Sequence, residues 1–386
     1  MKWGKVKVGD CCEVTSSKRI FFSEYVDSGV PFYRSKEIIE SSNGQAISEP
    51  LFISQEKYDE LKNHFGVPQS GDMLLTSVGT IGVPYIVREK DYFYFKDGNL
   101  TWFRNFSDEL DSKYLYFWVK SSEGQSVLNN TTIGSSQKAL TIASLKGLEI
   151  PSPPAPVQKR IVEFLAGYDD LIENNQKQIK LLEEAAQRLY KEWFVDLRFP
   201  GYETTPIVDG VPEGWEKVEV GTCIAKVART KQVMTAELLE VGRIPVVDQS
   251  RSFVAGYTND EETIVDLGIP IIVFGDHTRV LKYIQFPFAK GADGTQLIVT
   301  NNEKMPQSLF YCSLVNVDLS NYHYARHFKY LKAEEILLPS LDVAHQFDGV
   351  VSPLFEQVQM LRDKCKLATE ARDRLLPKLM NGEIEV

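Results

Sequence analysis

Apolar side chains follow a strict heptad spacing in a long stretch of this chain. They recur in alternating steps of four and three residues, at Ile161, Leu165, Tyr168, Ile172, Asn175, Ile179, Leu182, Ala186, Leu189 and Trp193. This is the spacing of a helix built to lie along another helix. Asn175 is the one polar group in this seam, a residue type that fixes register and partner at some cost in stability.

The same seam recurs 186 residues later with the phase unchanged. Its positions are Phe347, Val351, Leu354, Val358, Leu361, Cys365, Ala368, Arg372, Leu375 and Leu379. Two matched seams predict two helices that pack on each other. The alternative is that each helix packs only on its own globular neighbour, but an ordinary core-facing stripe is wider and drifts around the helix. We expect Gly167 to break the first segment, which leaves a helix from about Asp169 to Asp196, roughly 40 Å long.

The stretches before each seam also resemble each other. Trp3-x-Lys5-Val6-x-Val8-Gly9 recurs as Trp215-x-Lys217-Val218-x-Val220-Gly221, with a shift of 212 residues that also matches Cys11 to Cys223. Ile150-Pro151 and Leu338-Pro339 match with a shift of 188, and a Pro/Gln signal precedes each helix (IPSPPAPVQ and LPSLDVAHQ). The changing shift predicts two domains with one framework and different loops.

This order gives an α+β architecture of domain, helix, domain, helix. The predicted boundaries are 1–154 for the first domain, 155–198 for the central helical region, 199–213 for a linker, 214–341 for the second domain and 342–386 for the distal helical region. If the helices pack together, the second must run back along the first, so we expect an antiparallel coiled coil with pseudo-twofold symmetry. Glycine turns between β-branched and aromatic runs predict strands in 71–95 and 269–299, and short helices are expected within 107–128 and at 307–315.

Composition and charge indicate which ligands and which cellular location to expect for this protein. The chain has 386 residues and a formal net charge of −10, with 17 basic and 19 acidic residues in 1–154 and 13 and 15 in 214–341. Both domains are therefore nearly neutral, and we expect this chain alone to bind polyanions weakly. The five cysteines form no disulfide framework or zinc motif, and no run of 18 apolar residues occurs, so the cytoplasm is the expected location.

Motifs that carry catalysis are absent from the sequence. There is no phosphate-binding loop, no G-x-G-x-x-G, no H-E-x-x-H and no G-x-S-x-G. Glu60-x-Lys62 has nuclease-like spacing but no preceding Pro-Asp, and His323-x-x-x-His327 has no third metal ligand nearby. We therefore expect neither a catalytic site nor a metal site.

Both predicted domains carry loops rich in side chains that read base edges and phosphates. Each loop taken alone is compatible with plain solvated surface, and Asp276 beside Arg279 could be a local ion pair that shapes a turn. Matching loops on two domains favour a DNA interface. The candidate residues are Arg34, Lys36, Ser77, Thr80, Gln137 and Lys138 in the first domain, and Asp248, Gln249, His277, Thr278, Arg279, His323, Arg326 and His327 in the second.

Several segments together resemble one known family. AQRLYKEWFVDLRFPGYE (186–203) and RDRLLPKLMNGEIEV (372–386) are similar to the central and distal conserved regions of the specificity subunits of type I restriction–modification enzymes. IPSPPAPVQKRIVEFL resembles the start of the central region, and FGDHTR (274–279) a run common in their target recognition domains. One departure is LPSLDVAHQ, which lacks the second Pro-Pro and leaves the start of the second helix open.

The resemblance implies a non-catalytic subunit that reads a bipartite, asymmetric DNA site, one half per domain, with the helix pair setting the unread spacer. It implies two modification subunits that bind S-adenosylmethionine and methylate adenine, and restriction subunits that use ATP and Mg²⁺. Docking is expected on the outward faces of the helices, with Trp193, Phe194 and Phe199 as candidates. A different class, a coiled-coil scaffold with two protein-binding domains, would also explain the acidity, but not the Arg/Gln/His/Asp loops that differ between the copies.

Overall fold

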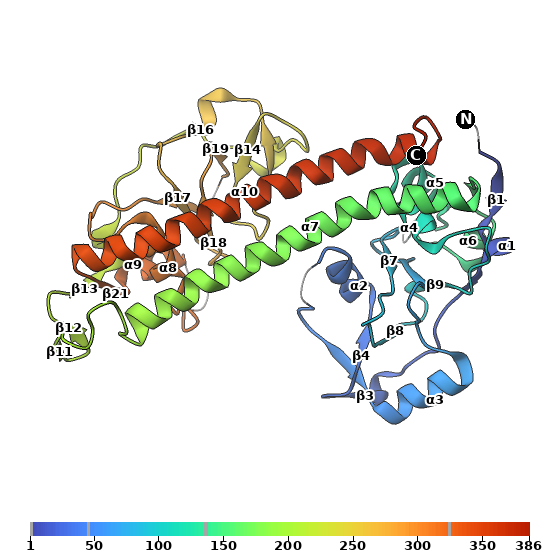
Figure 1. Cartoon of the computed structure of the whole chain (residues 1–386), viewed down its shortest axis with the longest axis horizontal. Coiled ribbons are helices and arrows are strands. Elements are labelled where there is room, and N and C mark those ends of the chain that lie inside the picture. Colours follow the sequence, from blue (N-terminus) through green and yellow to red (C-terminus); the bar gives the residue numbers. More distant parts are fainter. Residues whose placement is uncertain (1–2, 45–46, 135–137, 293, 323–325) are drawn as a thin grey trace. The chain divides into compact units, whose positions relative to one another are not determined.

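The computed structural model describes residues 3–44, 47–134, 138–292, 294–322 and 326–386. The chain divides into two compact units (Figure 1). Unit 1 comprises Met1–Asn174 and Lys364–Val386, and unit 2 comprises Asn175–Asp363. Each unit combines a mixed α/β head with a segment of two long helices, α7 (Ala155–Tyr190) and α10 (Leu341–Met380). None of the described helices is both long enough and apolar enough to cross a membrane.

The head of unit 1 contains two four-stranded sheets with the strand orders β2-β9-β6-β7 and β3-β5-β4-β8. A short pair, β1 with β10, joins the beginning and the end of the head. The strands are β1 (Lys5–Lys7), β2 (Glu13–Thr15), β3 (Tyr25–Val26), β4 (Val30–Tyr33), β5 (Leu51–Ile53), β6 (Met73–Thr76), β7 (Pro84–Ile86), β8 (Tyr94–Phe95), β9 (Leu100–Arg104) and β10 (Glu149–Pro151). The helices are α1 (Val8–Cys11), α2 (Ser35–Ser42), α3 (Gln55–Phe65), α4 (Ser112–Lys120), α5 (Ser122–Thr131) and α6 (Ile142–Lys146), with a 3-10 turn at Phe22–Glu24.

The head of unit 2 repeats this framework. Its sheets have the orders β15-β14-β19-β16 and β18-β17-β20, β13 pairs with β21, and β11 pairs with β12. The strands are β11 (Ile207–Val208), β12 (Val211–Pro212), β13 (Glu216–Glu219), β14 (Ile244–Val247), β15 (Gly256–Thr258), β16 (Ile264–Val265), β17 (Ile271–Gly275), β18 (Leu281–Ile284), β19 (Phe288–Lys290), β20 (Thr295–Ile298) and β21 (Glu335–Leu338). The helices are α8 (Gln307–Val315) and α9 (His327–Ala333), with 3-10 turns at Val220–Cys223, Thr235–Glu237 and Glu261–Thr263.

The repeated Trp-x-Lys-Val-x-Val-Gly motif has a physical explanation in both heads. Val8 and Val220 are fully buried, and the glycine that follows each one lies against a helix. A Cβ on Gly9 would lie 2.8 Å from the Cβ of Lys146 in α6, and one on Gly221 would lie 3.1 Å from the carbonyl oxygen of Lys332 in α9. Each head therefore needs a residue without a side chain at this position.

Strand register corrects the sequence match at the end of each head. Val6 pairs with Ile150, and Val218, its counterpart in the repeat, pairs with Ile336. The residue equivalent to Ile150 is therefore Ile336 and not Leu338. The shift is 186 residues, the same as that between the two helical seams. The match to Leu338-Pro339 was wrong because β21 continues for two residues beyond Ile336.

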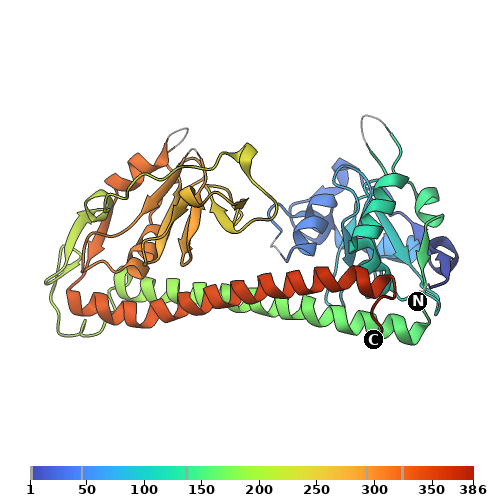
Figure 2. The same cartoon turned by 90° about the horizontal axis from the view of Figure 1, so that it is seen from above.

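The two long helices lie side by side and antiparallel within each unit (Figures 1 and 2). In unit 1, Asp169 forms an ion pair with Arg372 at 2.5 Å, and the Cys365 Sγ lies 3.8 Å from the Ile172 carbonyl oxygen. Residue numbers therefore increase along α7 where they decrease along α10, as in an antiparallel pair. In unit 2, Glu183 pairs with Arg362 at 2.6 Å, and the Tyr190 and Phe347 rings are in edge contact. The predicted mixed fold with two long helices in a coiled coil is confirmed.

Most of the seam faces the helix contact or the adjoining head. Asn175, Val358, Leu361 and Leu379 are buried, whereas Ile172, Ile179, Leu182, Leu189, Trp193, Cys365 and Leu375 are half-buried. The Asn175 amide nitrogen is buried and has no hydrogen-bond partner among the described residues. Arg372, the charged position in the second seam, is held by Asp169.

The predicted break at Gly167 was wrong. Helix α7 runs without interruption from Ala155 to Tyr190 and ends in a π-helical turn at Lys191–Val195. Gly167 is exposed, with nothing near its missing Cβ. The neighbouring residue Leu165 is fully buried, so packing of the apolar face outweighs the roughly 1 kcal/mol that one glycine costs a helix.

In the Pro/Gln signal before the first helix, Gln158 has a clear structural role. Gln346, the corresponding residue of the second signal, does not share this role. The buried Gln158 amide donates to the carbonyl oxygens of Glu109 and Pro153 and accepts from the Asp111 N–H, so it fixes the start of α7 on the head. Gln346 instead bonds to Asp342 on the exposed face of α10. Helix α10 begins at Leu341, one residue before the predicted start of the distal region.

Candidate nucleic-acid interface

The candidate loops of unit 2 meet at one end of its strands. The first loop follows β14 (248–252), the second connects β17 to β18 (276–280), and the third leads into α9. The hydroxyl of Thr278 donates to the backbone carbonyl of Gln249 at 2.6 Å, and the Gln249 amide oxygen accepts from the His277 N–H at 3.1 Å. These contacts bring together residues 28 and 29 positions apart in the chain.

Asp276 joins the second loop to the third. Its carboxylate accepts from the Phe328 N–H at 2.8 Å, and its backbone carbonyl accepts from the His327 N–H at 2.9 Å. Asp276 is only 3% exposed, so this carboxylate caps the start of α9 and is not available to a ligand. The possible Asp276–Arg279 ion pair is therefore not the contact that shapes this turn in the described structure.

Arg279 also supports the loops from within. Its backbone has a φ of +60°, which is uncommon for a residue with a side chain. Its guanidinium donates to the carbonyl of Tyr322 at 2.6 Å and to Nε2 of His327 at 3.2 Å. Burial, and secondarily the charge of Arg279, lower the pKa of His327, so the neutral imidazole is favoured. Arg279 and His327 thus act as internal supports, and neither is free to bind a base.

Lys282 is a functional support that the sequence analysis missed. It lies on β18, is 4% exposed, and its ammonium donates to the carbonyl oxygens of Asp248 and Ser252 at 2.7 and 2.5 Å. The Asp248 carboxylate in turn accepts from the Ser250 N–H and hydroxyl. The sequence offered one signal, because Lys282 occupies a position within the apolar strand LKYI.

The exposed part of this unit 2 interface is therefore smaller than predicted. His277, Thr278 and Arg326 are exposed, and Gln249 is half-buried. Asp248 is half-buried and is occupied by Ser250 and Lys282. His323 lies outside the described residues. Between residues 326 and 329 the chain also exposes Lys329.

The unit 1 candidates divide into two groups. Ser77, a predicted DNA-binding residue, is 2% exposed, and its hydroxyl bonds to the Thr101 hydroxyl at 2.7 Å, so this side chain supports the turn from within. Thr80 and Lys138 are exposed. The Leu140 N–H donates to the Ser77 carbonyl at 2.9 Å, and Ala139 bridges to Val78, so the segment with Lys138 lies beside the 77–80 turn. Gln137 lies outside the described residues.

Arg34 and Lys36 are both paired with carboxylates. Arg34 forms a 2.5 Å ion pair with the fully buried Glu37, and this pairing raises the pKa of the guanidinium. Lys36 pairs with Glu49 at 2.9 Å on the surface. A buried Glu37 would lose its partner if Arg34 turned toward a ligand, so Arg34 is a structural residue. Lys36 can exchange its exposed partner at little cost.

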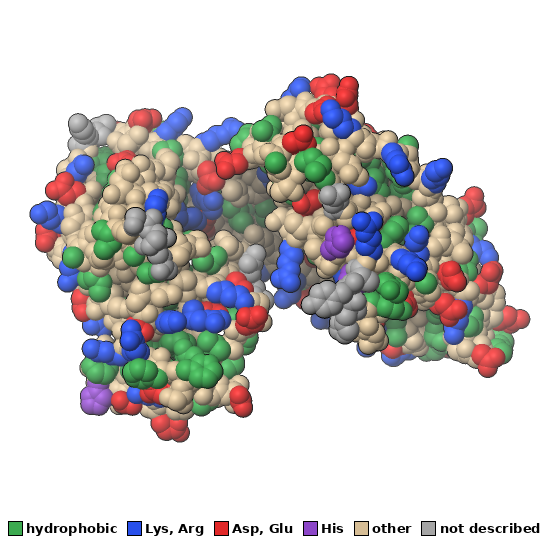
Figure 3. Space-filling view, turned by 180° about the vertical axis from the view of Figure 1, so that it is seen from behind, with side chains coloured by type: hydrophobic (Ala, Val, Ile, Leu, Met, Phe, Trp, Pro, Cys, Tyr) green, Lys and Arg blue, Asp and Glu red, His purple; other side chains and the backbone are tan. Residues whose placement is uncertain are grey.

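Charges of both signs are interspersed on the face of the molecule in Figure 3. Lys and Arg side chains alternate there with Asp and Glu side chains over both heads. This agrees with the near-neutral charge of each domain in the sequence. Recognition of DNA by such a surface depends on local contacts more than on a broad positive field.

Comparison with known proteins gives consistent matches. Residues 1–184 match the family described as type I restriction modification DNA specificity domain. The chain is 26% identical to the type I restriction enzyme MjaIX specificity subunit of Methanocaldococcus jannaschii, in an alignment covering 100% of this chain and 94% of the relative. A putative specificity subunit of Haemophilus influenzae is 29% identical over 48% of this chain and 45% of its own length.

A solved structure shares the fold over nearly the whole chain. The crystal structure of a type I restriction–modification S subunit from M. genitalium superposes with a TM-score of 0.60 at 16% identity, covering 98% of this chain and 96% of that one.

Proposed function

We propose that the chain is a specificity subunit of a type I restriction–modification enzyme, to which it is similar over its whole length, and that it reads a bipartite, asymmetric DNA site with one half per head. The observation that carries the proposal is that the two heads repeat one framework but present different side chains. The 77–80 turn exposes Thr80 in unit 1, whereas the 276–280 turn exposes His277 and Thr278 in unit 2. A shared framework with different exposed loops is suited to reading two different sequences.

The helix pair sets the length of the unread spacer in this proposal. Helix α7 has 36 residues and leads from the head of unit 1 to that of unit 2 without a break. At 1.5 Å per residue this is roughly 54 Å of continuous helix. A continuous helix resists bending, and its pairing with α10 makes it stiffer still.

The modification subunits are proposed to dock on the outward faces of α7 and α10. Two of the residues first considered for docking, Phe194 and Phe199, are 4% and 2% exposed and pack on Trp215, so they belong to the core of unit 2. Large apolar side chains that do reach the surface of the helices are Phe164, Leu171, Leu181, Val350, Met360 and Leu367. These side chains are better candidates for contacts with a partner.

Catalysis is assigned to the partners. S-adenosylmethionine would bind to the modification subunits, and ATP and Mg²⁺ to restriction subunits, while this chain selects the DNA site in the cytoplasm. The assembled complex supplies further DNA contacts, which would offset the net charge of −10 on this chain.

Selection from randomised duplex DNA tests the proposed function. The chain is co-expressed with the modification subunit encoded beside it, and bound DNA is recovered and sequenced. We expect two short defined blocks separated by a fixed gap. A stable complex that enriches no sequence would contradict the proposal and favour a protein-binding scaffold. A single undivided block would contradict the two-headed reading alone.

A further inference from the structure

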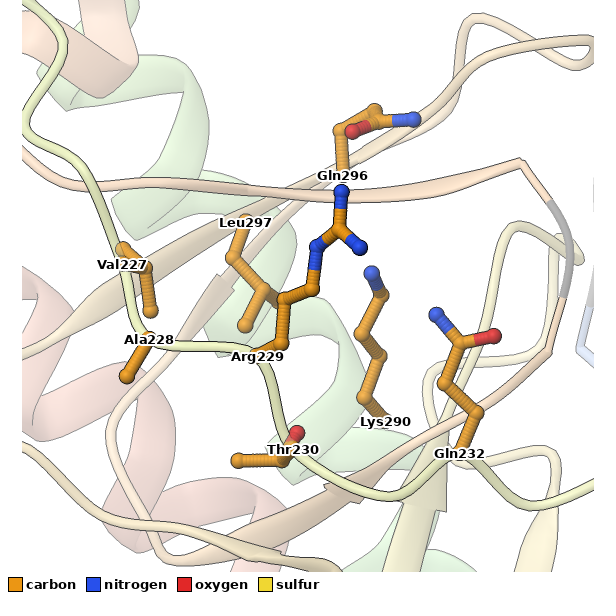
Figure 4. A pocket seen from close by; sticks show the side chains of 8 residues that line it. All are labelled: Val227, Ala228, Arg229, Thr230, Gln232, Lys290, Gln296 and Leu297. Carbon is orange, nitrogen blue, oxygen red and sulfur yellow. The ribbon is translucent and has the colours of Figure 1, made fainter.

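A basic cavity in unit 2 lies beside the candidate interface and was not among the predicted sites. It has a volume of about 530 Å³ and is lined by residues 227–230 and Gln232, by Lys290 of β19 and by Gln296 and Leu297 of β20. Figure 4 shows the side chains of Arg229, Lys290 and Gln232 extending toward the same space, whereas the Gln296 side chain points away from it. A volume of about 300–1,000 Å³ is usual for ligand sites.

The two cations of this cavity have no carboxylate partner among the described residues. Arg229 and Lys290 form no ion pair there, and none of the residues that line the cavity is acidic. By contrast Lys231, which lies between Arg229 and Gln232, pairs with Asp260 at 2.6 Å. Burial lowers the pKa of Lys290, and the positive charge of Arg229 lowers it further. Two neighbouring cations in a half-buried site are stabilised by an anion between them.

An unused hydroxyl points to the same kind of ligand. Thr230 lines the cavity, and its hydroxyl is buried and has no hydrogen-bond partner in the described structure. Buried polar atoms are paired in most structures, so an orphan at a binding site signals a missing partner. A phosphate group supplies what these residues lack, because it accepts hydrogen bonds from a hydroxyl, a guanidinium and an ammonium at once.

The same cavity occurs at the equivalent place in unit 1. Residues 15–18 correspond to 227–230 by the 212-residue repeat, and they line a cavity of about 270 Å³ with Tyr94 of β8 and Trp102 of β9. The parallel pairs β4–β8 and β14–β19 make β8 the counterpart of β19. Here too a buried hydroxyl, that of Ser17, has no partner among the described residues.

The unit 1 cavity carries less free charge. Its Arg104 is paired with Glu13 at 2.8 Å, and Lys18 lies over the Phe65 ring at 4.6 Å. Repetition of the cavity in two copies of one framework argues for a shared role, and the free cations in unit 2 argue for the stronger site there.

Two glycines close to the cavity residues Lys290 and Gln296 pack against residues of the unit 2 interface. Gly291 follows Lys290 directly, and a Cβ on it would lie 2.5 Å from the Cβ of Asp248. Gly294, two residues before Gln296, packs against the side chains of Gln249 and His277, each 2.8 Å from the position of its missing Cβ. The cavity therefore lies next to the loops that expose His277 and Thr278.

We propose that Arg229, Lys290 and Thr230 bind one phosphate group of the DNA backbone next to the half-site read by unit 2. This inference rests on the proposed function, since it takes DNA as the source of the phosphate. The contact positions the duplex and carries no sequence information. Arg229 and Lys290 are thus affinity residues, distinct from the exposed loop residues that would select the bases.

The test compares DNA affinity in the complex of the full chain with its modification subunit. The variants are Arg229→Gln, Lys290→Gln and the pair together, with Lys217→Gln as the matched control, an exposed lysine on β13 of the same unit. Loss of one phosphate contact reduces the slope of log K against log salt by about 1, and lowers affinity roughly tenfold at 0.1 M salt. The selected DNA sequence should not change. Arg229→Lys should restore most of the affinity.

Each outcome has one meaning. Unchanged affinity and salt slope in the double variant, with wild type bound, would overturn this inference and leave the proposed function intact. A changed sequence preference would show that the cavity reads a base. A wild-type complex that binds no DNA would overturn the proposed function and this inference together. Binding of inorganic phosphate by the wild-type chain, without any effect of the variants on DNA affinity, would identify a free-anion site and also overturn the inference. Arg229 is exposed, so its single variant guards against loss of folding in the Lys290 variant.

Discussion

His327 is 5% exposed, and its Nε2 accepts a hydrogen bond from the Arg279 guanidinium. Nε2 can accept this bond only while it carries no proton. Protonation would remove this acceptor and place two cations in contact. Burial and Arg279 accordingly lower the pKa of His327, although Asp276 opposes the shift and His277 adds to it. Protonation of this imidazole at acidic pH should therefore destabilise the loops of unit 2.

Stability of unit 2 should depend on pH through this residue. A histidine whose folded pKa lies below its unfolded value of about 6.5 stabilises the fold above that value, and the contribution is lost as pH falls through the folded pKa. We expect thermal stability to fall from pH 7 toward pH 5.5 in the wild type. His327→Gln keeps an acceptor for Arg279 and cannot titrate, so its melting temperature should vary less over that window. An identical pH profile in both proteins would show that other groups control this range.

At the scale of elements, the short first helix of each head packs closely against a second helix, and a glycine makes this close packing possible. A Cβ at Gly9 would lie 2.8 Å from a side-chain carbon and 2.9 Å from a backbone oxygen of Lys146, whereas Gly4 has nothing within 4 Å. Gly9→Ala should destabilise the chain by about 1–3 kcal/mol, the cost of overpacking. Gly221→Ala should cost less because its nearest contact is 3.1 Å.

Denaturant unfolding of the three variants checks this order. Gly4→Ala is the matched control and should stay within about 0.5 kcal/mol of the wild type. Equal changes in the free energy of unfolding for the Gly4 and Gly9 variants would indicate that backbone entropy, and not packing against α6, determines the effect of these substitutions.

In helix α7, by contrast, replacing a glycine with alanine should increase stability. Gly167 is exposed in the helix, and a Cβ there meets no atom within 4 Å. Gly167→Ala should therefore stabilise the chain by about 1 kcal/mol, the difference in helix propensity. The midpoint of denaturant unfolding measures it. A lower midpoint would mean that α7 needs a flexible point at this position.

The sequence predicted these elements unevenly, for physical reasons. Period and spacing revealed the helical seams and the repeated head, because each depends on a regular pattern in the sequence. The helices α2 and α3 were not predicted because their sequences are mostly polar. The break at Gly167 was predicted from local propensity, which the packing of α7 overrides.

The candidate site was predicted at the level of loops but not of side chains. Loop composition located the segments around Gln249, His277 and Thr80. It could not separate exposed residues from supports such as Ser77, Arg279 and His327, since that depends on contacts between loops distant in sequence. The basic cavity escaped for the same reason, because Arg229 and Lys290 come from separate strands and loops.

At the scale of the whole molecule, two heads of one framework should read their half-sites independently. Each head has its own hydrophobic core, and the contacts that fix the candidate loops, such as Thr278 to Gln249 and Leu140 to Ser77, remain within one unit. We therefore expect a change in one exposed loop to leave the base contacts of the other head unaltered. This independence distinguishes a bipartite reader from a single continuous interface.

Reciprocal substitutions test the independence. His277→Ala, in the complex with the modification subunit, should relax the sequence selected in one half-site by about 1–3 kcal/mol of discrimination at one base pair. Thr80→Ala should relax the other half-site, and neither should change the gap between them. Selected duplexes from a randomised pool give both half-sites and the gap in one experiment. Changes in the same half-site for both variants, or in both half-sites for either one, would show that the heads do not read separate sequences. Both side chains are exposed, so their removal leaves the supports of each loop in place, and a change in selection reports on contact with DNA rather than on folding.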